Sequence, residues 1–425
     1  MNFGAFFNHT FASLKIRNYR LYFIGQAISL SGTWMQIIAL GWLTLEVTGS
    51  GSQLGLVIAV QYVPILLFGF WGGMIADRFD KRRILILTQA GLGLVALSMS
   101  IVVFAGIIRP WMLFSFAVCW GIIRIFDNPT RLTFVFEMVD ASHIKNAVSL
   151  NATENNLARA IGPSIGGVLI ATTGIAFCFF FNAVTYIAVI AMLFFMREHE
   201  LHRSPPIARK PGQLREGLRY IMETPRIRDV LIVIAVIGTF AYEFQVSLPL
   251  FAQQTFLAGA SAYAALMASF GVGAAIGGLY AASRHTVAPR QFLISGFLFG
   301  ASIIGTSLAP TLPIAIIGMV FIGIFATNVT SIGNTMIQLE SIPQMRGRVM
   351  ALWEIAMIGS TPIGGPIIGW IGQNIGARWA IATGGIATVS AIILGSRRLL
   401  KKVAMQEIPT DVKIGEEEMN IANSQ

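Results

Sequence analysis

The chain alternates between long apolar runs and short polar connections. A helix that crosses the hydrocarbon core of a bilayer needs about 20 predominantly apolar residues, and the sequence holds twelve such stretches. They lie at residues 20–45, 53–76, 84–107, 110–135, 145–172, 175–196, 229–254, 261–283, 291–309, 312–337, 348–371 and 376–396. This pattern predicts an all-α integral membrane protein with twelve transmembrane helices.

One connection is much longer than the others. Residues 197–228 contain two proline-rich turns and then the segment 213–223, in which Leu214, Leu218 and Ile221 recur at helical spacing between charged residues. This segment predicts a short amphipathic helix, either lying at the membrane surface or acting as a plain linker.

The long connection divides the chain into two pseudo-symmetric six-helix bundles. We expect an N-terminal bundle at 1–196, a cytoplasmic linker at 197–228, a C-terminal bundle at 229–402 and a disordered tail at 403–425, which has little apolar content. The sequence Gly-Pro-x-Ile-Gly at 162–166 recurs 203 residues later. Two parallel repeats that enclose a site near the midplane are typical of transporters.

Charge sets the orientation of the predicted helices. Of the 30 lysines and arginines, only Arg109 and Arg378 fall in odd-numbered connections. Because cytoplasmic loops carry an excess of lysine and arginine, we expect both termini in the cytoplasm. The net charge of +10 does not indicate nucleic acid, since the basic residues follow the membrane sides rather than form one patch.

The composition of the chain excludes several classes of protein. Charged residues make up 12% of the chain and the mean hydropathy is +0.70, whereas soluble domains carry about 25% charged residues. The 2 cysteines and 5 histidines form no metal or catalytic motif, so we expect no enzyme, no metal and no bound cofactor. The polar segments are too small for a catalytic or sensory domain, which leaves a membrane receptor or enzyme as a remote alternative.

The connection between the second and third predicted helices carries a motif. Two glycines that permit close helix packing precede an Asp-Arg pair and a basic triplet. The spacing resembles the loop between helices 2 and 3 of the major facilitator superfamily, where that family has a glycine in place of Asp80. The residues that match are Gly73, Asp77, Arg78 and Arg82, and the resemblance implies that they form a gate on the cytoplasmic side.

The segment from the fourth to the sixth predicted helix is more specific. It reads FDNPTR at 126–131, NAVSLN at 146–151 and ARAIGP at 158–163. These motifs resemble the bacterial branch of the superfamily that includes enterobactin exporters and macrolide efflux proteins, over about residues 10–400. The resemblance implies the superfamily fold, alternating access, and export driven by the proton gradient.

The expected cargo is a small organic molecule such as a siderophore or a hydrophobic drug. A lipid or lysolipid flippase on the same fold is the alternative, and a laterally open, apolar cavity would favour it. We expect a monomer in the lipid bilayer of the bacterial inner membrane.

The fifth predicted helix contains Gly-Pro-x-x-Gly-Gly, which resembles a motif associated with antiporters. Ala158 stands where that motif has an earlier glycine. The other reading is a packing kink, because proline removes a backbone donor and can bend a helix. The motif residues are Gly162, Pro163, Gly166 and Gly167.

Several ionisable residues lie inside the predicted membrane spans, where each costs roughly 2.5–3.5 kcal/mol and therefore faces an interior or a cavity. Arg124, Asp127 and Arg131 share one helical face at spacing i, i+3, i+7, and Glu154 and Arg159 belong to a polar stripe on the next helix. One interpretation is a structural ion-pair network, which we favour for Asp127 and Arg131. Arg159 lacks an acid one turn away and is a candidate to contact an anionic substrate or a coupling carboxylate.

Glu243 lies near the midplane of the seventh predicted helix. A carboxyl group in a medium of low dielectric constant binds a proton more readily than it does in water, as a proton-coupled exporter requires. The alternative is a neutral glutamic acid that hydrogen-bonds a neighbouring helix. Further residues that could line the cavity are Trp34, Gln36, Gln61, Tyr62 and Asn328.

Overall fold

The computed structural model describes residues 11–202, 213–283 and 287–399, and every regular element within them is helical. The first six long helices are α2 (Arg17–Thr48), α3 (Gly51–Arg78), α4 (Lys81–Phe104), α5 (Pro110–Met138), α6 (Ile144–Thr172) and α7 (Ile175–Phe194). The second set consists of α9 (Pro225–Val236), α10 (Phe244–Leu250), α11 (Ala260–Ala282), α12 (Pro289–Ser307), α13 (Leu312–Glu340), α14 (Pro343–Met357), α15 (Thr361–Asn374) and α16 (Ala377–Leu399). The predicted tail at 403–425 lies outside the described residues.

Helix length and apolar content agree with a membrane protein. In the described part of the chain, 10 helical segments are long and apolar enough to cross a bilayer. Two further helices, α6 with 29 residues and α12 with 19, are not among those segments. The polar stripe predicted on the fifth helix lies on α6, and it lowers the hydropathy of that helix.

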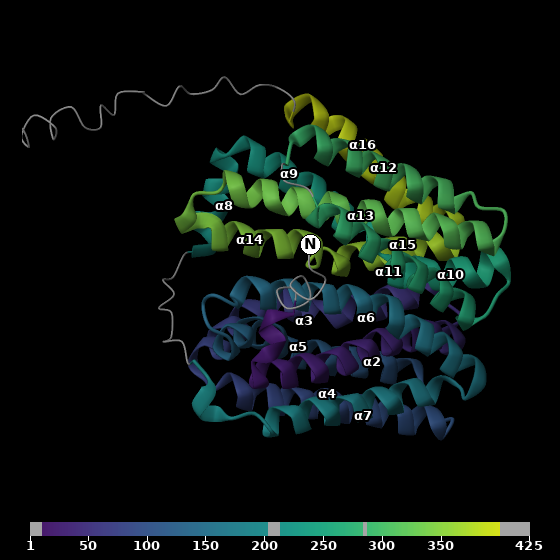
Figure 1. Cartoon of the computed structure of the whole chain (residues 1–425). Helices are drawn as coiled ribbons and strands as arrows, with labels where there is room; N and C mark the ends of the chain where they lie inside the picture. The colour runs from purple at the N-terminus through teal and green to yellow at the C-terminus, as the bar shows by residue number, and fades with distance from the viewer. Residues whose placement is uncertain (1–10, 203–212, 284–286, 400–425) are drawn as a thin grey trace, which may run out of the picture.

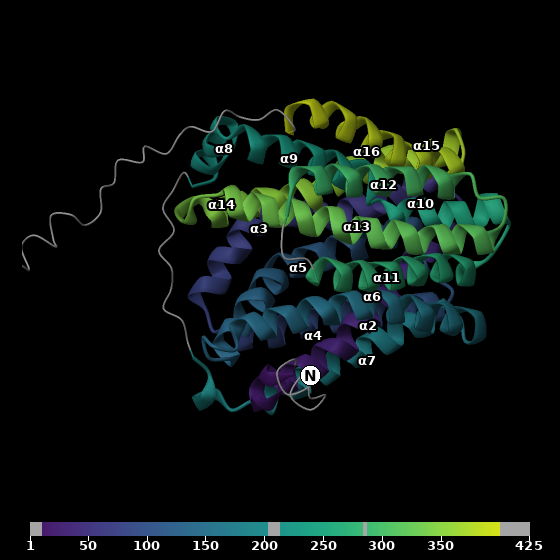
Figure 2. The same cartoon turned by 45° about the horizontal axis from the view of Figure 1, so that its top comes forward.

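The helices pack as two groups that meet along one plane (Figures 1 and 2). The N-terminal group holds α2–α7, and the C-terminal group holds α9–α16. They meet where α6 packs on α11 and where α3 packs on α15. The largest apolar cluster lies mainly in the C-terminal group but includes Ile38, Trp42 and Leu54 of α2 and α3, so the interface is part of the apolar core.

Two predicted spans that we expected to be continuous are interrupted. The stretch 229–254 contains α9, a π-helix η3 (Ile237–Ala241), a non-helical step at Tyr242 and Glu243, then α10 and a second π-helix η4 (Phe251–Thr255). The stretch 348–371 divides into α14 and α15 at Ile358–Ser360. The two interruptions touch, since a Cβ added at Gly238 would lie 2.7 Å from the carbonyl oxygen of Met357.

The predicted linker helix is present as α8 (Gln213–Glu223). It packs on α14: Glu216 forms an ion pair of 2.8 Å with Arg348, and the Tyr220 hydroxyl accepts a hydrogen bond from the backbone of Ile342 at 3.3 Å. Ile221 is buried, while Met222 is exposed. Helix α8 is therefore attached to the C-terminal group through α14.

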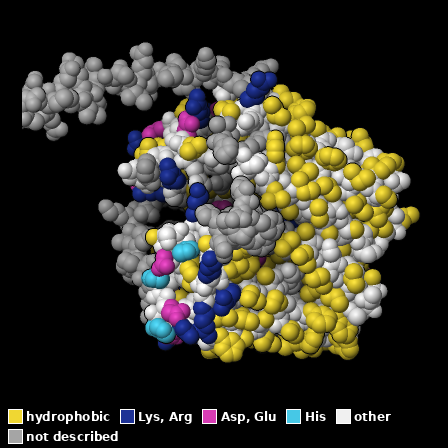
Figure 3. Space-filling model, in the orientation of Figure 1, with side chains coloured by type: hydrophobic (Ala, Val, Ile, Leu, Met, Phe, Trp, Pro, Cys, Tyr) yellow, Lys and Arg dark blue, Asp and Glu magenta, His cyan; other side chains and the backbone are white. Residues whose placement is uncertain are grey.

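The surface separates into a charged end and an apolar belt. Figure 3 shows the charged side chains gathered at one end and hydrophobic side chains covering the rest of the visible face. The charged end holds the α3–α4 connection, the α5–α6 connection and α8. We call the opposite end the far end.

Candidate functional site

The two groups of helices approach each other most closely through glycines toward the far end. A Cβ added at Gly55 of α3 would lie 2.8 Å from the carbonyl carbon of Gly365 of α15. In the same region the backbone N–H of Gly51 donates to Oε1 of Gln373 at 2.7 Å. The contact between Gly55 and Gly365 is made by backbone atoms, so helices α3 and α15 could not come this close if either of these glycines carried a side chain.

The motif on α6 makes the second close contact. Pro163 lies inside the continuous helix α6, and a Cβ at Gly162 would lie 2.6 Å from that of Trp34 in α2. A Cβ at Gly166 would lie 3.2 Å from Cγ of Met35, and one at Gly167 would lie 2.6 Å from Cβ of Ala264 in α11. The glycines of this motif therefore pack α6 against both groups of helices, which is the packing predicted from their small size.

The two groups part at the charged end. Helix α14 packs on α8, α9, α13 and η3, all outside the N-terminal group, whereas its continuation α15 packs on α3. Figure 3 shows the charged side chains of both groups gathered at this end. Helices α3 and α15 are therefore in contact toward the far end, whereas α14 makes its main contacts inside the C-terminal group at the charged end.

Asp127 organises the charges on α5. Its side chain is fully buried, and its Oδ1 accepts hydrogen bonds from Thr88 at 2.9 Å and from Gln89 at 2.7 Å. Its Oδ2 lies 3.8 Å from Arg124 and 3.7 Å from Arg131. The shared face predicted from the spacing of these three residues is confirmed, and one carboxylate is divided between two guanidinium groups.

Glu154 lies near this network without joining it by an ion pair. The side chain is buried on α6, and its Oε1 has no hydrogen-bond partner within the described protein. One turn away, the Tyr19 hydroxyl donates to Oδ1 of Asn151 at 3.0 Å and so connects α2 to α6. The predicted stripe on α6 therefore faces the interior of the N-terminal group at Glu154.

Arg159 lies at the junction of the two groups. Its guanidinium carbon is 4.9 Å from the centre of the Trp34 ring in α2 and 5.8 Å from that of Phe270 in α11. Its buried Nε has no hydrogen-bond partner, and Arg159 has no ion pair in the described residues. Packing of a guanidinium over aromatic faces is favourable by about 0.5–2 kcal/mol, so the rings hold this cation in place of an acid.

Glu243 occupies the interruption of the seventh span. The residue is 3% exposed, and its Oε1 has no hydrogen-bond partner within the described protein. A Cβ added at Gly364 would lie 3.0 Å from that oxygen, and one at Gly365 would lie 3.6 Å from Oε2. Thr361, at the start of α15, interacts with the carboxyl group. The carboxyl therefore faces the N-terminal turn of α15 across a contact that only glycine permits.

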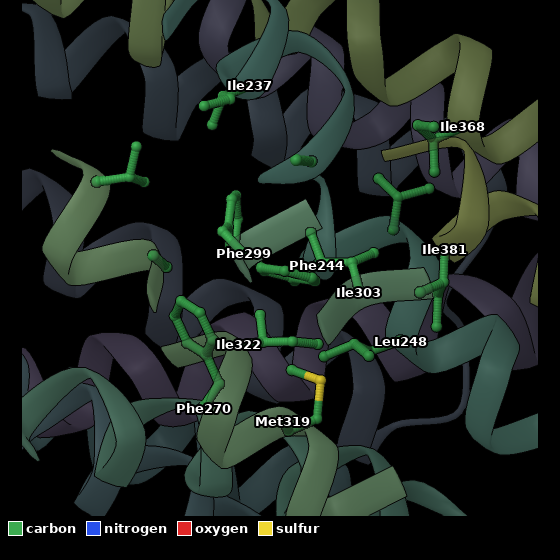
Figure 4. Close-up of a cluster of buried hydrophobic side chains, with 14 of the residues drawn as sticks. Ile237, Phe244, Leu248, Phe270, Phe299, Ile303, Met319, Ile322, Ile368 and Ile381 are labelled. Carbon is green, nitrogen blue, oxygen red and sulfur yellow. The ribbon is translucent and has the colours of Figure 1, made fainter. Parts of the chain in front are cut away.

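An apolar cluster begins directly after Glu243. The next residue, Phe244, packs with Phe270 at a ring distance of 5.1 Å, and Figure 4 shows both among Phe299 and Ile322. The nearby start of α15 favours a negative charge by at most about 2 kcal/mol, whereas burying an unpaired ion costs several kcal/mol. In this closed environment the uncharged carboxylic acid is the favoured form.

The predicted gate motif is described in part. Gly73 is buried and Arg78 is exposed, while the side chain of Asp77 lies outside the described residues. Arg82 forms an ion pair with Glu198, and its Nε donates to the carbonyl oxygen of Leu193 at 2.7 Å. In this state Arg82 therefore binds within the N-terminal group, at the end of α7.

Asp80 has a clear role in the same loop. Its Oδ1 accepts a hydrogen bond of 3.0 Å from the backbone N–H of Arg83 and caps the N-terminus of α4. Aspartate is among the preferred residues at this position. The departure from the family glycine is therefore explained by helix capping.

A buried ion pair was missed by the sequence reasoning. The ammonium group of Lys81, at the start of α4, contacts Oε1 of Glu137, near the end of α5, and the two side chains are 10% and 8% exposed. Lys81 and Glu137 are 56 residues apart, so helical spacing could not indicate this contact.

We expect Glu137→Gln to destabilise the protein by about 3–5 kcal/mol, because it leaves the buried Lys81 ammonium unpaired. Thermal unfolding of purified protein in detergent should show a lower Tm. The double variant Lys81→Met/Glu137→Leu removes both charges and should recover most of the loss. An unchanged Tm in Glu137→Gln would show that the pair does not support the fold.

The further polar residues predicted to line a cavity take different positions. Gln36 accepts a hydrogen bond of 2.6 Å from Asn182 inside the N-terminal group, and Asn328 donates to its own helix at 2.8 Å. Tyr62 meets the other group, since its hydroxyl accepts from Nε2 of Gln245 at 3.5 Å. Gln61 is buried. Only Trp34 and Tyr62 of this set therefore reach the junction between the groups.

The comparisons of this chain with known proteins agree on one family. The family described as transmembrane secretion effector matches residues 8–423. The staphyloferrin A transporter of Staphylococcus aureus is 24% identical over 374 residues, which cover 87% of this chain and 93% of that protein. The enterobactin exporter EntS of Escherichia coli O1:K1 is 24% identical over 405 residues, which cover 91% and 92% of the two chains.

Solved structures agree in fold. A bacterial homologue of the human lysosomal transporter Spinster, in an inward-facing and unoccupied conformation, aligns with a TM-score of 0.68 at 16% identity and covers 91% of this chain and 98% of its own. A POT family transporter in complex with 5-aminolevulinic acid aligns with a TM-score of 0.71 at 13% identity, over 89% and 95% of the two chains. These likenesses concern the fold alone.

Proposed function

The chain belongs to the transmembrane secretion effector family of major facilitator transporters, and on this premise we propose that it is a proton-coupled exporter of a small organic molecule. The relatives named above are transporters or exporters of the siderophores staphyloferrin A and enterobactin. A siderophore-like compound is therefore the first cargo to test, with hydrophobic drugs as the second.

We propose that the chain crosses the inner membrane twelve times, with both termini in the cytoplasm. The 10 helical segments that meet the length and hydropathy requirements are completed by α6 and α12. The charged end is the cytoplasmic end in this proposal, because lysine and arginine gather there. The segments 1–196 and 229–402 are the two bundles, joined by the linker 197–228.

The state of the molecule supports alternating access. With the charged end in the cytoplasm, the closed contacts at Gly55 and Gly365 lie on the periplasmic side and the open side faces the cytoplasm. An exporter takes up its cargo in this inward-open state. Rocking of the two bundles about the junction at α6 and α11 would then expose the cargo to the periplasm.

The burial of Glu243 between two interrupted helices is the observation that carries the proposal. While Glu243 is enclosed, its uncharged form is favoured. The ionised carboxylate would have an oxygen without a hydrogen-bond partner, and it would therefore need water or a cation beside it. Opening the contact between η3 and α15 would admit water and release the proton. Glu243 would therefore bind a proton in one state and release it in another, which is how a transporter couples to a proton gradient.

A transport assay tests the function directly. Inverted membrane vesicles that hold a proton gradient, acid inside, should take up siderophores or dyes, and an uncoupler should abolish that uptake. Uptake that continues unchanged with the uncoupler would contradict proton coupling and favour a facilitator or a lipid flippase.

The predicted gate at Asp77 gives a separate test. We propose that the Asp77 carboxylate contacts the positively charged N-terminal end of α14 when the cytoplasmic side is closed. We expect Asp77→Asn to favour the inward-open state and to lower transport, because a contact that holds the cytoplasmic side closed is lost. Cysteine labelling from the cytoplasmic side, measured beside uptake, reports both effects. Wild-type rates in the variant would show that Asp77 is not part of the gate.

A further inference from the structure

The positive charge at the centre of the molecule is only partly neutralised. Arg124, Arg131 and Arg159 lie on α5 and α6, and Asp127 is the carboxylate that pairs with two of them. In the middle of α5 and α6, three cations stand against two acids even with Glu154 ionised, and the next buried acid, Glu243, is favoured in its uncharged form while it is enclosed. An uncompensated cation at this depth in a membrane is costly and marks an ion or substrate pathway.

Arg159 and Arg124 share an unusual environment. Each guanidinium lies over a tryptophan ring, Arg159 over Trp34 at 4.9 Å and Arg124 over Trp120 at 4.7 Å. Each also has a buried Nε without a hydrogen-bond partner in the described protein. Both guanidinium groups thus pack on aromatic faces, and the Nε–H of each is left without an acceptor in the described protein.

The two cations can be reached from the interior. Both lie near the middle of their helices, and the side chain of Arg124 keeps 18% of its surface exposed. Arg159 is half-buried, and it lies between α2 of one group and Phe270 of the other. A ligand bound at Arg159 would therefore contact both groups of helices and would be released when they separate.

The chemistry of the pair selects a kind of ligand. A guanidinium presents its N–H donors in one plane, and a carboxylate accepts two parallel hydrogen bonds from that edge. An acid attached to a flat conjugated ring can bind edge-on while its ring packs on the neighbouring aromatic side chains. A cationic drug would instead be repelled by the net positive charge.

We infer that the cargo of this transporter is a planar anion, with a carboxylate on an aromatic ring, and that Arg159 is the residue that binds its acidic group. The ring lies against Trp34 and Phe270, and Arg124 takes a second acidic group where the cargo has one. This inference rests on the proposed function, since it names the substrate class of the exporter.

Binding to the purified protein tests the inference without any gradient. The probes are 2-hydroxybenzoate, its uncharged amide, and the non-planar anion cyclohexanecarboxylate, each measured by calorimetry in detergent. We expect 2-hydroxybenzoate to bind more tightly than the other two, by about tenfold or more relative to the amide, because the amide cannot accept a charge-assisted pair of hydrogen bonds.

Arg159→Gln should weaken binding of 2-hydroxybenzoate by about tenfold or more, and Arg159→Lys should recover only part of it, because lysine keeps the charge but not the planar fork. Arg109→Gln, at the exposed N-cap of α5, is the matched control and should bind as wild type. A preserved Tm shows that each variant is folded, and Trp34→Leu provides a second test of the site if Arg159→Gln is unstable.

Equal binding of the acid and its amide, no binding of the acid to wild type, or unchanged binding in Arg159→Gln would overturn the inference. The proposed function fails separately, through transport that ignores an uncoupler. Proton-driven uptake of a cationic dye with no binding of the planar acid would leave the exporter in place and reject this substrate class.

Discussion

Glu243→Gln is expected to abolish uptake driven by a proton gradient while leaving downhill exchange of substrate in place. Glutamine keeps the size and the hydrogen-bonding capacity of the acid, but it cannot bind and release a proton. Gradient-driven uptake into inverted vesicles should fall roughly tenfold or more, to the level seen with an uncoupler, since no ionisable group remains at the interruption. Exchange of labelled for unlabelled substrate should continue, because it needs alternating access alone.

The matched control is Glu46→Gln. Glu46 is an exposed acid near the far end of α2, where it accepts a hydrogen bond of 2.7 Å from Trp42. This variant should couple as wild type does. If Glu243→Gln kept uncoupler-sensitive uptake, the coupling acid would have to be sought at Asp127 or Glu154.

Gly55→Val is expected to stop turnover by preventing closure of the far end. A Cβ at this position would lie 2.8 Å from the carbonyl carbon of Gly365 and 3.1 Å from Cα of Pro366, and both are backbone atoms that cannot rotate away. Helices α3 and α15 must then stay apart, so the state open at the far end is favoured. Transport should fall roughly a hundredfold, because the population of the opposite state is reduced by a comparable factor.

Labelling separates this effect from misfolding. A cysteine introduced at Gln245, in a Cys119→Ser background, should react faster with a membrane-impermeant thiol reagent applied from the periplasm in Gly55→Val than in the parent. Gly69→Val is the matched control on the same helix, because the space around Gly69 holds only an atom of Ile65 at 3.9 Å. Wild-type transport by Gly55→Val would show that this contact need not form in the cycle.

The sequence predicted helices well, because apolar length is a local property of the chain. The stretch 53–76 was predicted and is observed as Gly51–Arg78. The interruptions at Glu243 and Ile358–Ser360 were not predicted. They lie against each other in the fold, and the spacing of residues along one helix carries no information about a contact with another helix. Helical spacing was enough to place Arg124, Asp127 and Arg131 on one face, but it could not supply the hydrogen bonds from α4 that fix Asp127.

The environment of Arg159 shows the same limit. The absence of an acid one turn away was readable from the chain, and it correctly separated Arg159 from the ion pairs on α5. The rings that replace the acid come from residues 34 and 270, far from residue 159 in the sequence. By contrast, the capping role of Asp80 was within reach, because aspartate directly before a basic, apolar helix is a common start signal.

The most direct test of the account is proton movement by purified protein in liposomes. A downhill gradient of exported substrate is imposed with no initial pH difference and no membrane potential, and a pH-sensitive dye is enclosed in the lumen. The account predicts that substrate leaving the liposomes draws protons in, so that the lumen acidifies in wild type and not in Glu243→Gln. Substrate efflux from wild-type liposomes at constant internal pH would contradict proton-coupled export.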